Sequence, residues 1–173
     1  MTAELTRYRD MKTKKIAFIG LFASVSLMLA YIEALLPPIY AAAPGIKLGL
    51  ANIISVFALY KYGAKEAVTV CLVRISLSAL LFGNPWSLAY SAAGAVLSLT
   101  VMILLKLSGK FSPVGVSIAG GVFHNLGQIL LAMLVLKTSG LLLYMAVLAV
   151  TGTLAGVFIG LCASFMLKYL KKV

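Results

Sequence analysis

The sequence is poor in acidic residues. Its 173 residues include only four carboxylate side chains, Glu4, Asp10, Glu33 and Glu66, against fifteen lysines and arginines. Magnesium-dependent diphosphate chemistry needs clustered carboxylates as hard oxygen ligands, and these four are scattered along the chain. We therefore expect that the chain by itself catalyses no such reaction.

The sequence also lacks the residue patterns of other kinds of catalytic or metal site. One histidine, His124, and two separate cysteines, Cys71 and Cys162, offer no metal cluster and no CxxC pair. The single aspartate, Asp10, is cytoplasmic in the expected topology and His124 is intramembrane, so a Ser-His-Asp triad is implausible. No glycine-rich phosphate loop ending in Lys-Ser or Lys-Thr occurs. These absences predict a protein that is not an enzyme and that holds no cofactor or metal.

Charge of either sign is scarce, and hydrophobic residues dominate. Charged residues make up 11% of the chain and hydrophobic residues 62%. A soluble domain of this length carries about 25% charged residues, so a lipid bilayer is the expected surrounding. The basic residues form short clusters between apolar runs, with no basic stripe interleaved with aromatics, which argues against nucleic acid as a partner.

Six apolar runs follow a polar, basic segment, residues 1–15. A membrane-spanning helix needs about 20 apolar residues, and backbone groups in lipid must be satisfied internally, so the spans are helices. The second and third runs are short. We predict an all-α integral membrane bundle of six transmembrane helices that occupies residues 16–173 as one domain. The runs are Ile16–Leu36, Leu48–Tyr60, Ala67–Phe82, Trp86–Leu105, Val114–Leu136 and Leu141–Leu167.

The placement of positive charge predicts the orientation. Six crossings that start from a cytoplasmic N-terminus put twelve basic residues inside and only Lys47 and Lys137 outside, with Arg74 within a span. Basic residues favour cytoplasmic loops. The alternative, in which the second and third runs form one re-entrant hairpin, would reverse every later loop and remove this asymmetry. We therefore predict a multi-pass protein of the cell membrane with both termini in the cytoplasm.

One connection, Pro37–Ile46, contains three prolines and a glycine and is expected to be non-helical. It falls on the outer side, where it either caps a cavity or simply breaks the helix.

Small residues mark two helix faces. Gly152, Gly156 and Gly160 repeat every four residues, so another helix backbone can approach that face closely. Its partner is a helix of the same chain or of another subunit. On the first run Ala17, Gly20 and Ser24 form a surface that suits either docking of a second membrane protein or packing within the chain.

Polar side chains inside the predicted spans carry the functional hypothesis. An ionisable group in hydrocarbon costs roughly 2.5–3.5 kcal/mol on insertion scales. The predicted topology gathers these groups in the outer half of the bundle, as a pocket that captures a small-molecule substrate or as groups that only pair with one another. Arg74 and Lys47 would bind an anionic group of the substrate, Glu33 a cationic one, and the amides would orient it. The candidates are Glu33, Lys47, Asn52, Arg74, Asn84, His124 and Gln128.

Three segments, in this order and spacing, resemble one bacterial family over nearly the whole chain. They are PGIKLGLAN (Pro44–Asn52), KEAVTVCLVRISLSALLFGN (Lys65–Asn84) and SPVGVSIAGGVFHNLGQ (Ser112–Gln128). The Ile-Glu pair within Tyr31–Glu33 also resembles that family. The chain resembles the Gx transporter family, also labelled heptaprenyl diphosphate synthase component I. That family in turn resembles the substrate-binding S components of energy-coupling-factor transporters, which are six-helix membrane proteins that capture vitamins or metal ions from outside.

The resemblance implies a partner. S components dock, partly through small residues of the first helix, onto a membrane coupling subunit served by two ATPases. The docking pattern in that group is Ala-x-x-x-Ala. Here Ala17 is followed by Leu21 at the fourth position, and Gly20 with Ser24 offers a substitute.

Three functions are compatible with these features. The first is solute uptake as an S-component-like protein, which needs a power source outside this chain. The second is an independent secondary carrier in which Glu33 or His124 couples protons. The third is a non-catalytic membrane subunit of an isoprenoid (heptaprenyl diphosphate) or quinone-linked redox enzyme. We favour the first.

Overall fold

The computed structural model describes residues 2–35 and 49–170, with side chains described from residue 13 onward. All regular structure in these ranges is helical, which confirms the all-α prediction. Lys47 and the connection Pro37–Ile46 lie outside the described residues. The elements are α1 (Thr2–Leu35), α2 (Asn52–Lys61), α3 (Ala64–Leu81), α4 (Pro85–Leu107), α5 (Pro113–Leu136), a short 3-10 helix η1 (Gly140–Tyr144) and α6 (Met145–Tyr169).

Local signals explain where the helices begin and end. Helices α4 and α5 each start with a proline, whose missing N–H costs nothing in a first turn. In both cases the preceding side chain, Asn84 or Ser112, accepts a hydrogen bond from a backbone N–H of that turn. Gly63, with φ at 120°, separates α2 from α3. Lys137, with φ at 49°, ends α5 in the left-handed region.

Three helix starts differ from the prediction. Helix α1 begins at Thr2 rather than Ile16, because residues 2–15 are polar but contain no proline or glycine to break a helix. Helix α2 begins at Asn52 rather than Leu48, because Gly49 has φ at 79° and opens a turn instead. Helix α3 begins three residues earlier than Ala67.

Four helical segments are long and apolar enough to cross a membrane: Thr13–Leu35, Pro85–Leu107, Pro113–Leu136 and Gly140–Tyr169. Helix α2 is apolar but has only 10 residues, about 15 Å at 1.5 Å per residue, half of the roughly 30 Å hydrocarbon core. Helix α3 has 18 residues and includes Lys65, Glu66 and Arg74. The described structure therefore supports a helical membrane protein, with four helical segments that could each cross a bilayer.

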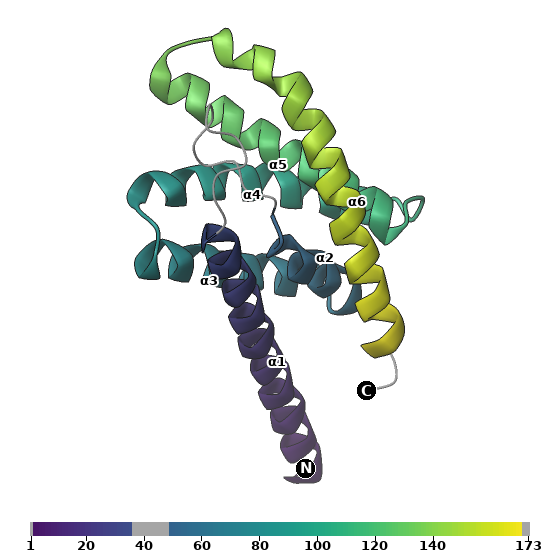
Figure 1. Cartoon of the computed structure of the whole chain (residues 1–173). Helices are drawn as coiled ribbons and strands as arrows, with labels where there is room; N and C mark the ends of the chain where they lie inside the picture. Colours follow the sequence, from purple (N-terminus) through teal and green to yellow (C-terminus); the bar gives the residue numbers. More distant parts are fainter. Residues whose placement is uncertain (1, 36–48, 171–173) are drawn as a thin grey trace.

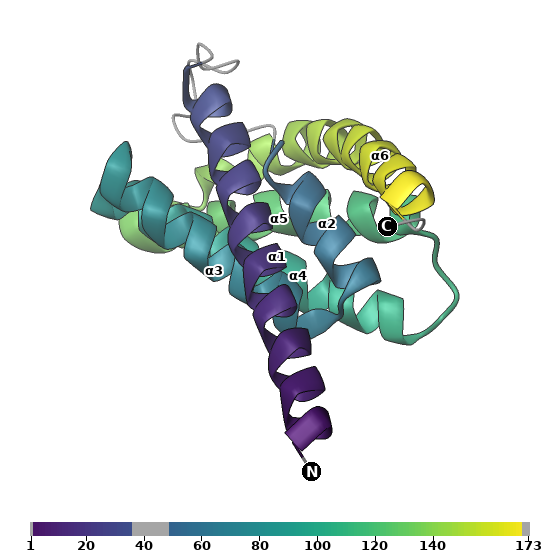
Figure 2. The same cartoon turned by 90° about the horizontal axis from the view of Figure 1, so that it is seen from below.

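The short helix α2 lies in the middle of the molecule. It contacts α1, α3, α5 and α6, and Figure 2 shows it between α1 and α6. All six residues from Ile54 to Leu59 are buried. A helix that is buried on every side contacts protein rather than solvent, so α2 forms the core on which the longer helices pack.

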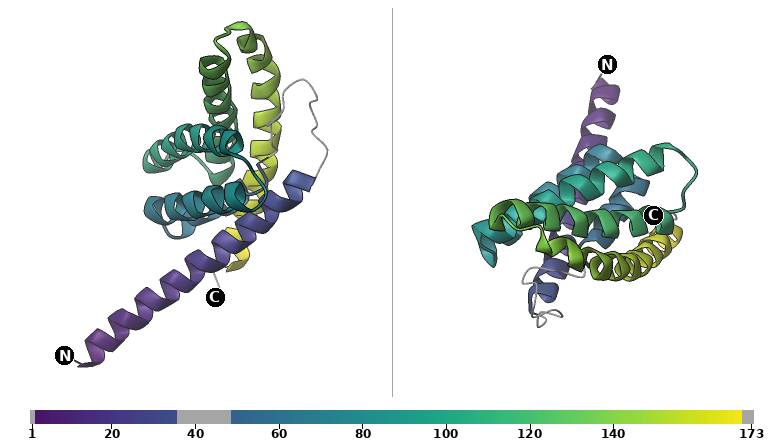
Figure 3. Two further views of the ribbon diagram at one scale, coloured as in Figure 1. Left: turned by 90° about the vertical axis from the view of Figure 1, so that its left-hand side faces the viewer. Right: turned by 90° about the horizontal axis from the view of Figure 1, so that it is seen from above.

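The other helices are arranged around this core. Helices α4, α5 and α6 pack one after the other, while α1 packs against α3 and α2. The N-terminal part of α1 runs away from the rest of the molecule, as Figures 1 and 3 show. All six α-helices contribute to one apolar core, with Phe22, Phe57, Val70, Leu99, Val116 and Ile159 among its members.

The glycine repeat on α6 lies against α5 of the same chain. A Cβ added to Gly156 would lie 2.5 Å from the Cα of Ile118, and one added to Gly160 would lie 2.6 Å from the Cα of Val114. At Gly152 the added atom would be 3.0 Å from the carbonyl carbon of Gly121. The two backbones are therefore in direct contact. The helix that packs on this glycine face is α5 of the same chain.

Candidate functional site

A turn before α2 is held by side chains of α1. The carboxylate of Glu33 accepts hydrogen bonds from the backbone N–H groups of Gly49, at 2.5 Å, and Leu50, at 3.2 Å. The hydroxyl of Ser26 donates to the carbonyl of Ala51 at 3.1 Å. Glu33 is buried, and a negative charge at a helix N-terminus is stabilised by the helix dipole. Both oxygens of Glu33 therefore accept hydrogen bonds from the chain's own backbone.

The residue that follows this turn contacts a buried arginine of α3. Asn52, the first residue of α2, accepts a hydrogen bond through Oδ1 from Nη2 of Arg74, at 3.5 Å. The same Nη2 lies 3.5 Å from the sulfur of Cys71, one turn earlier on α3. Arg74 is 9% exposed. Its Nε is buried and has no hydrogen-bond acceptor among the residues that the structure describes.

These contacts connect three helices. We call the set formed by Glu33, Gly49, Leu50, Asn52 and Arg74 the polar junction. It runs from α1 through the turn to α2 and on to α3. Three of the predicted site residues therefore lie in one region, and each belongs to a different helix.

His124 and Gln128 form a second polar pair on α5. Their Nε2 atoms are 3.3 Å apart. The imidazole packs against Gly94 of α4, where an added Cβ would lie 2.8 Å from its Cε1. One turn further on, an added Cβ at Gly127 would lie 2.6 Å from the carbonyl oxygen of Ala93. The pair therefore lies in the α4–α5 contact, whereas the contacts of Arg74 lie between α2 and α3.

Two further polar residues, Asn84 and Asn125, hold helices in place through hydrogen bonds to backbone groups. Asn84 is exposed and caps α4, with Oδ1 accepting from the N–H of Ser87 at 2.8 Å; the structure does not bring it to the polar junction. Asn125, which points away from His124 on the helix, is buried and donates to the carbonyl of Leu148 at 2.9 Å, linking α5 to α6. Lys47 lies outside the described residues.

The small-residue face of α1 points away from the bundle. Ala17, Gly20 and Ser24 are all exposed. No atom lies within 4 Å of a Cβ built on Gly20, and the hydroxyl of Ser24 donates to the Gly20 carbonyl at 2.9 Å. Within the described part of the chain, then, this face packs against nothing.

At the C-terminal ends of α2, α4 and α6, lysine side chains hold the helices together. Lys61 donates to the carbonyl of Leu170 at 2.7 Å, and Lys106 donates to the carbonyl of Leu59. These bonds join the C-terminal ends of α2, α4 and α6, where a positive charge complements the helix dipole. The hydroxyl of Tyr60 also donates to the carbonyl of Phe111, just before α5, at 3.2 Å. We call this region the basic end.

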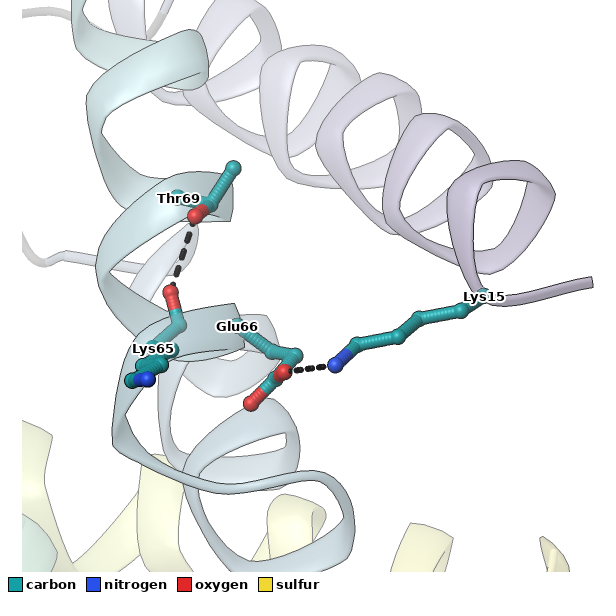
Figure 4. Close-up of polar contacts among 4 residues, drawn as sticks. All are labelled: Lys15, Lys65, Glu66 and Thr69. Carbon is teal, nitrogen blue, oxygen red and sulfur yellow. Dashed lines mark hydrogen bonds and ion pairs between the residues drawn. The ribbon is translucent and has the colours of Figure 1, made fainter. Parts of the chain in front are cut away.

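An ion pair ties α1 to the basic end (Figure 4). The ammonium group of Lys15 contacts the carboxylate of Glu66 in the first turn of α3, and Thr69 donates to the carbonyl of Lys65 at 2.8 Å. The hydrogen bond from Lys15 lowers the pKa of Glu66, with help from the backbone of that turn. The pair is not predictable from local sequence patterns, because its partners are 51 residues apart.

Among the described residues, no three His, Cys, Asp or Glu side chains are grouped closely enough to hold a metal ion.

A family model described as heptaprenyl diphosphate synthase component I matches residues 22–166. That range covers most of the chain and includes the polar junction, the His124–Gln128 pair and the glycine repeat of α6. No curated protein and no solved structure matches the chain.

Proposed function

The chain belongs to the heptaprenyl diphosphate synthase component I family, and from this premise we propose that it is a membrane protein that captures a small solute from outside the cell. In this proposal it works like the S component of an energy-coupling-factor transporter and is not an enzyme. The family label names a component of a synthase, but a component need not carry the catalytic carboxylates, and this chain has only four acidic residues.

The polar junction is the observation that carries the proposal. Arg74 is 9% exposed in a chain that is 62% hydrophobic. A buried guanidinium is costly unless it is paired and hydrogen-bonded, and its partners in the described residues are one amide oxygen and one sulfur, both at 3.5 Å. An incompletely satisfied ionisable group inside a membrane protein is a functional-site candidate.

Six crossings remain part of the proposal, and two features support them. The basic end gathers Lys15, Lys61, Lys65 and Lys106, so the loops expected in the cytoplasm lie together. Helix α2 is too short to span alone, but irregular backbone is tolerated at membrane depth where protein satisfies it. Glu33 and Ser26 do this for the turn before α2. In this arrangement both termini are cytoplasmic and the polar junction lies toward the outside.

Orientation can be tested by cysteine labelling in intact cells. Lys137→Cys and Lys110→Cys are placed in a chain whose Cys71 and Cys162 are changed to alanine. A membrane-impermeant maleimide should label position 137 directly and position 110 only after permeabilisation. The reverse pattern would reject the outward-facing junction.

Uptake also needs a source of energy. The exposed face formed by Ala17, Gly20 and Ser24 supports docking to a membrane coupling subunit with ATPases, since small residues allow close helix contact in lipid. Purification of the full chain from its own membranes should recover such subunits. Gly20→Leu should reduce their recovery, while the same change at exposed Thr100 should not. Recovery that Gly20→Leu leaves unchanged would remove this face from the proposal.

Solute capture itself is tested by retention. The purified full chain in detergent is mixed with a small-molecule extract of the growth medium, desalted rapidly and denatured, and the released compounds are measured by mass spectrometry. The native protein should retain at least one compound that a heat-denatured sample does not. Equal release from both samples would refute the proposal.

A second candidate function follows from the family description. It is a non-catalytic membrane subunit of a prenyl diphosphate synthase. Membrane extracts from cells lacking the chain should then lose prenyl diphosphate synthesis, whereas unchanged synthesis would leave solute capture as the function.

A further inference from the structure

The charge of Arg74 is not balanced within the described chain. The guanidinium has five N–H donors and no acceptor. Among residues 13–35 and 49–170 its contacts are Oδ1 of Asn52 and Sγ of Cys71, both made by Nη2, and no ion pair joins it to a carboxylate. Its Nε, although buried, has no acceptor in those ranges. The remaining N–H donors of Arg74 would therefore need oxygen acceptors from a molecule other than the described chain.

The chain has almost no carboxylate left to supply them. Glu66 pairs with Lys15 at the basic end, and both oxygens of Glu33 accept backbone N–H groups. The other two acids, Glu4 and Asp10, belong to the first 15 residues. They precede Glu33 on the same helix by more than 20 residues, which is over 30 Å along the axis at about 1.5 Å per residue.

We propose that the captured solute carries an oxyanion, a carboxylate or a phosphate, that binds Arg74 at the polar junction. This inference rests on the proposed function and adds the chemical class of the substrate. A planar guanidinium matches such groups with two parallel hydrogen bonds. Asn52 already takes one donor of the guanidinium through Oδ1, and the anion bonds to the donors that remain.

The retention experiment above tests this class when it is repeated with three variants. Arg74→Gln removes the charge, Arg74→Lys keeps the charge but loses the fork, and Ser76→Ala, at an exposed position on the same helix, serves as control. We expect the retained compound to carry a carboxylate or phosphate. Its retention should fall at least tenfold in Arg74→Gln, fall less in Arg74→Lys and stay unchanged in Ser76→Ala. Circular dichroism and gel filtration establish that each variant is folded.

A second measurement works even if a variant folds poorly. Thermal unfolding of the wild-type protein is followed in sodium acetate and in sodium phosphate, against sodium chloride at equal ionic strength. At concentrations too low for the general stabilising effect of such salts, we expect a higher midpoint in at least one of the two oxyanions, and which one raises it distinguishes carboxylate from phosphate recognition. Equal midpoints in all three salts would count against the proposal.

The outcomes separate the two ideas. A retained compound that is neutral or cationic, or one that Arg74→Gln holds as well as wild type, would overturn the oxyanion proposal and leave solute capture standing. If no compound is retained by any folded variant, solute capture itself fails and the oxyanion proposal fails with it.

Discussion

The contact between α5 and α6 gives the sharpest structural prediction, and Gly156→Ala is the change that tests it. The added Cβ would lie 2.5 Å from the Cα of Ile118 and 2.8 Å from the carbonyl oxygen of Ser117. Both are backbone atoms, so no side chain can rotate away. Ordinary contact begins near 3.4 Å, and the two helices would have to separate by about 1 Å in a close-packed interface.

The expected loss follows from two opposing effects. Overpacking a well-packed contact costs about 1–3 kcal/mol, and a forced backbone shift belongs at the upper end of that range. Alanine in place of glycine stabilises a helix by about 1 kcal/mol. We expect Gly156→Ala to lower the free energy of unfolding by about 1–2 kcal/mol. The matched control is Gly20→Ala on exposed α1, where nothing lies within 4 Å; it should gain up to about 1 kcal/mol.

Unfolding by added SDS, with the protein in a mild detergent and circular dichroism as the readout, measures both variants. The informative quantity is the difference between them, expected to be about 1–3 kcal/mol. If Gly156→Ala proved as stable as Gly20→Ala, the close approach of α5 and α6 would be wrong, and with it the position of α6 against the core.

Three other predictions concern polar contacts. Glu33→Ala leaves two backbone N–H groups before α2 without their acceptor and should lower the free energy of unfolding by about 2–5 kcal/mol, read from the same SDS titration; a loss under 1 kcal/mol would contradict the turn geometry. The hydrogen bond from Lys15 lowers the pKa of Glu66, and the pair should stabilise the folded protein by something on the order of 0.5 kcal/mol, because it is half-exposed. This stabilisation is present above about pH 4.3 and is lost as the pH falls through the lowered pKa of Glu66 in the folded protein. Glu66→Gln should flatten that part of a profile of stability against pH, and an unchanged profile would rule the pair out. Asn84→Ala should cost about 1 kcal/mol as a lost helix cap without changing solute retention, and reduced retention in a folded variant would return Asn84 to the binding site.

Some side-chain relations were predictable because they are local. His124 and Gln128 are four residues apart, so helical periodicity alone places them on one face, and their ring and amide nitrogens are 3.3 Å apart. The spacing of Gly152, Gly156 and Gly160 likewise predicts a face for close packing. Such spacing does not identify the partner, since a helix of another subunit would satisfy it equally well. Only the fold brings α5 to that face.

The role of Glu33 was not predictable in the same way. An intramembrane carboxylate is expected to bind a counter-ion or a ligand, because both satisfy its charge. The backbone N–H groups of Gly49 and Leu50 bond to it in the structure, and they lie 16 and 17 residues further along the chain. Asn84 shows the opposite case: Asn before Pro is a helix-start signal, and in the structure its side chain caps α4.

The sequence by itself determined the all-helical membrane character, the family, the clustering of positive charge and the shortage of acids. These properties depend on composition and local periodicity, which act before any long-range contact forms. Tertiary structure alone decided that α2 is buried on every side, that α1 holds the turn before it, and that Arg74 is left without a carboxylate partner in the described chain. Those outcomes depend on which helices meet, and that is set by packing between segments far apart in the sequence.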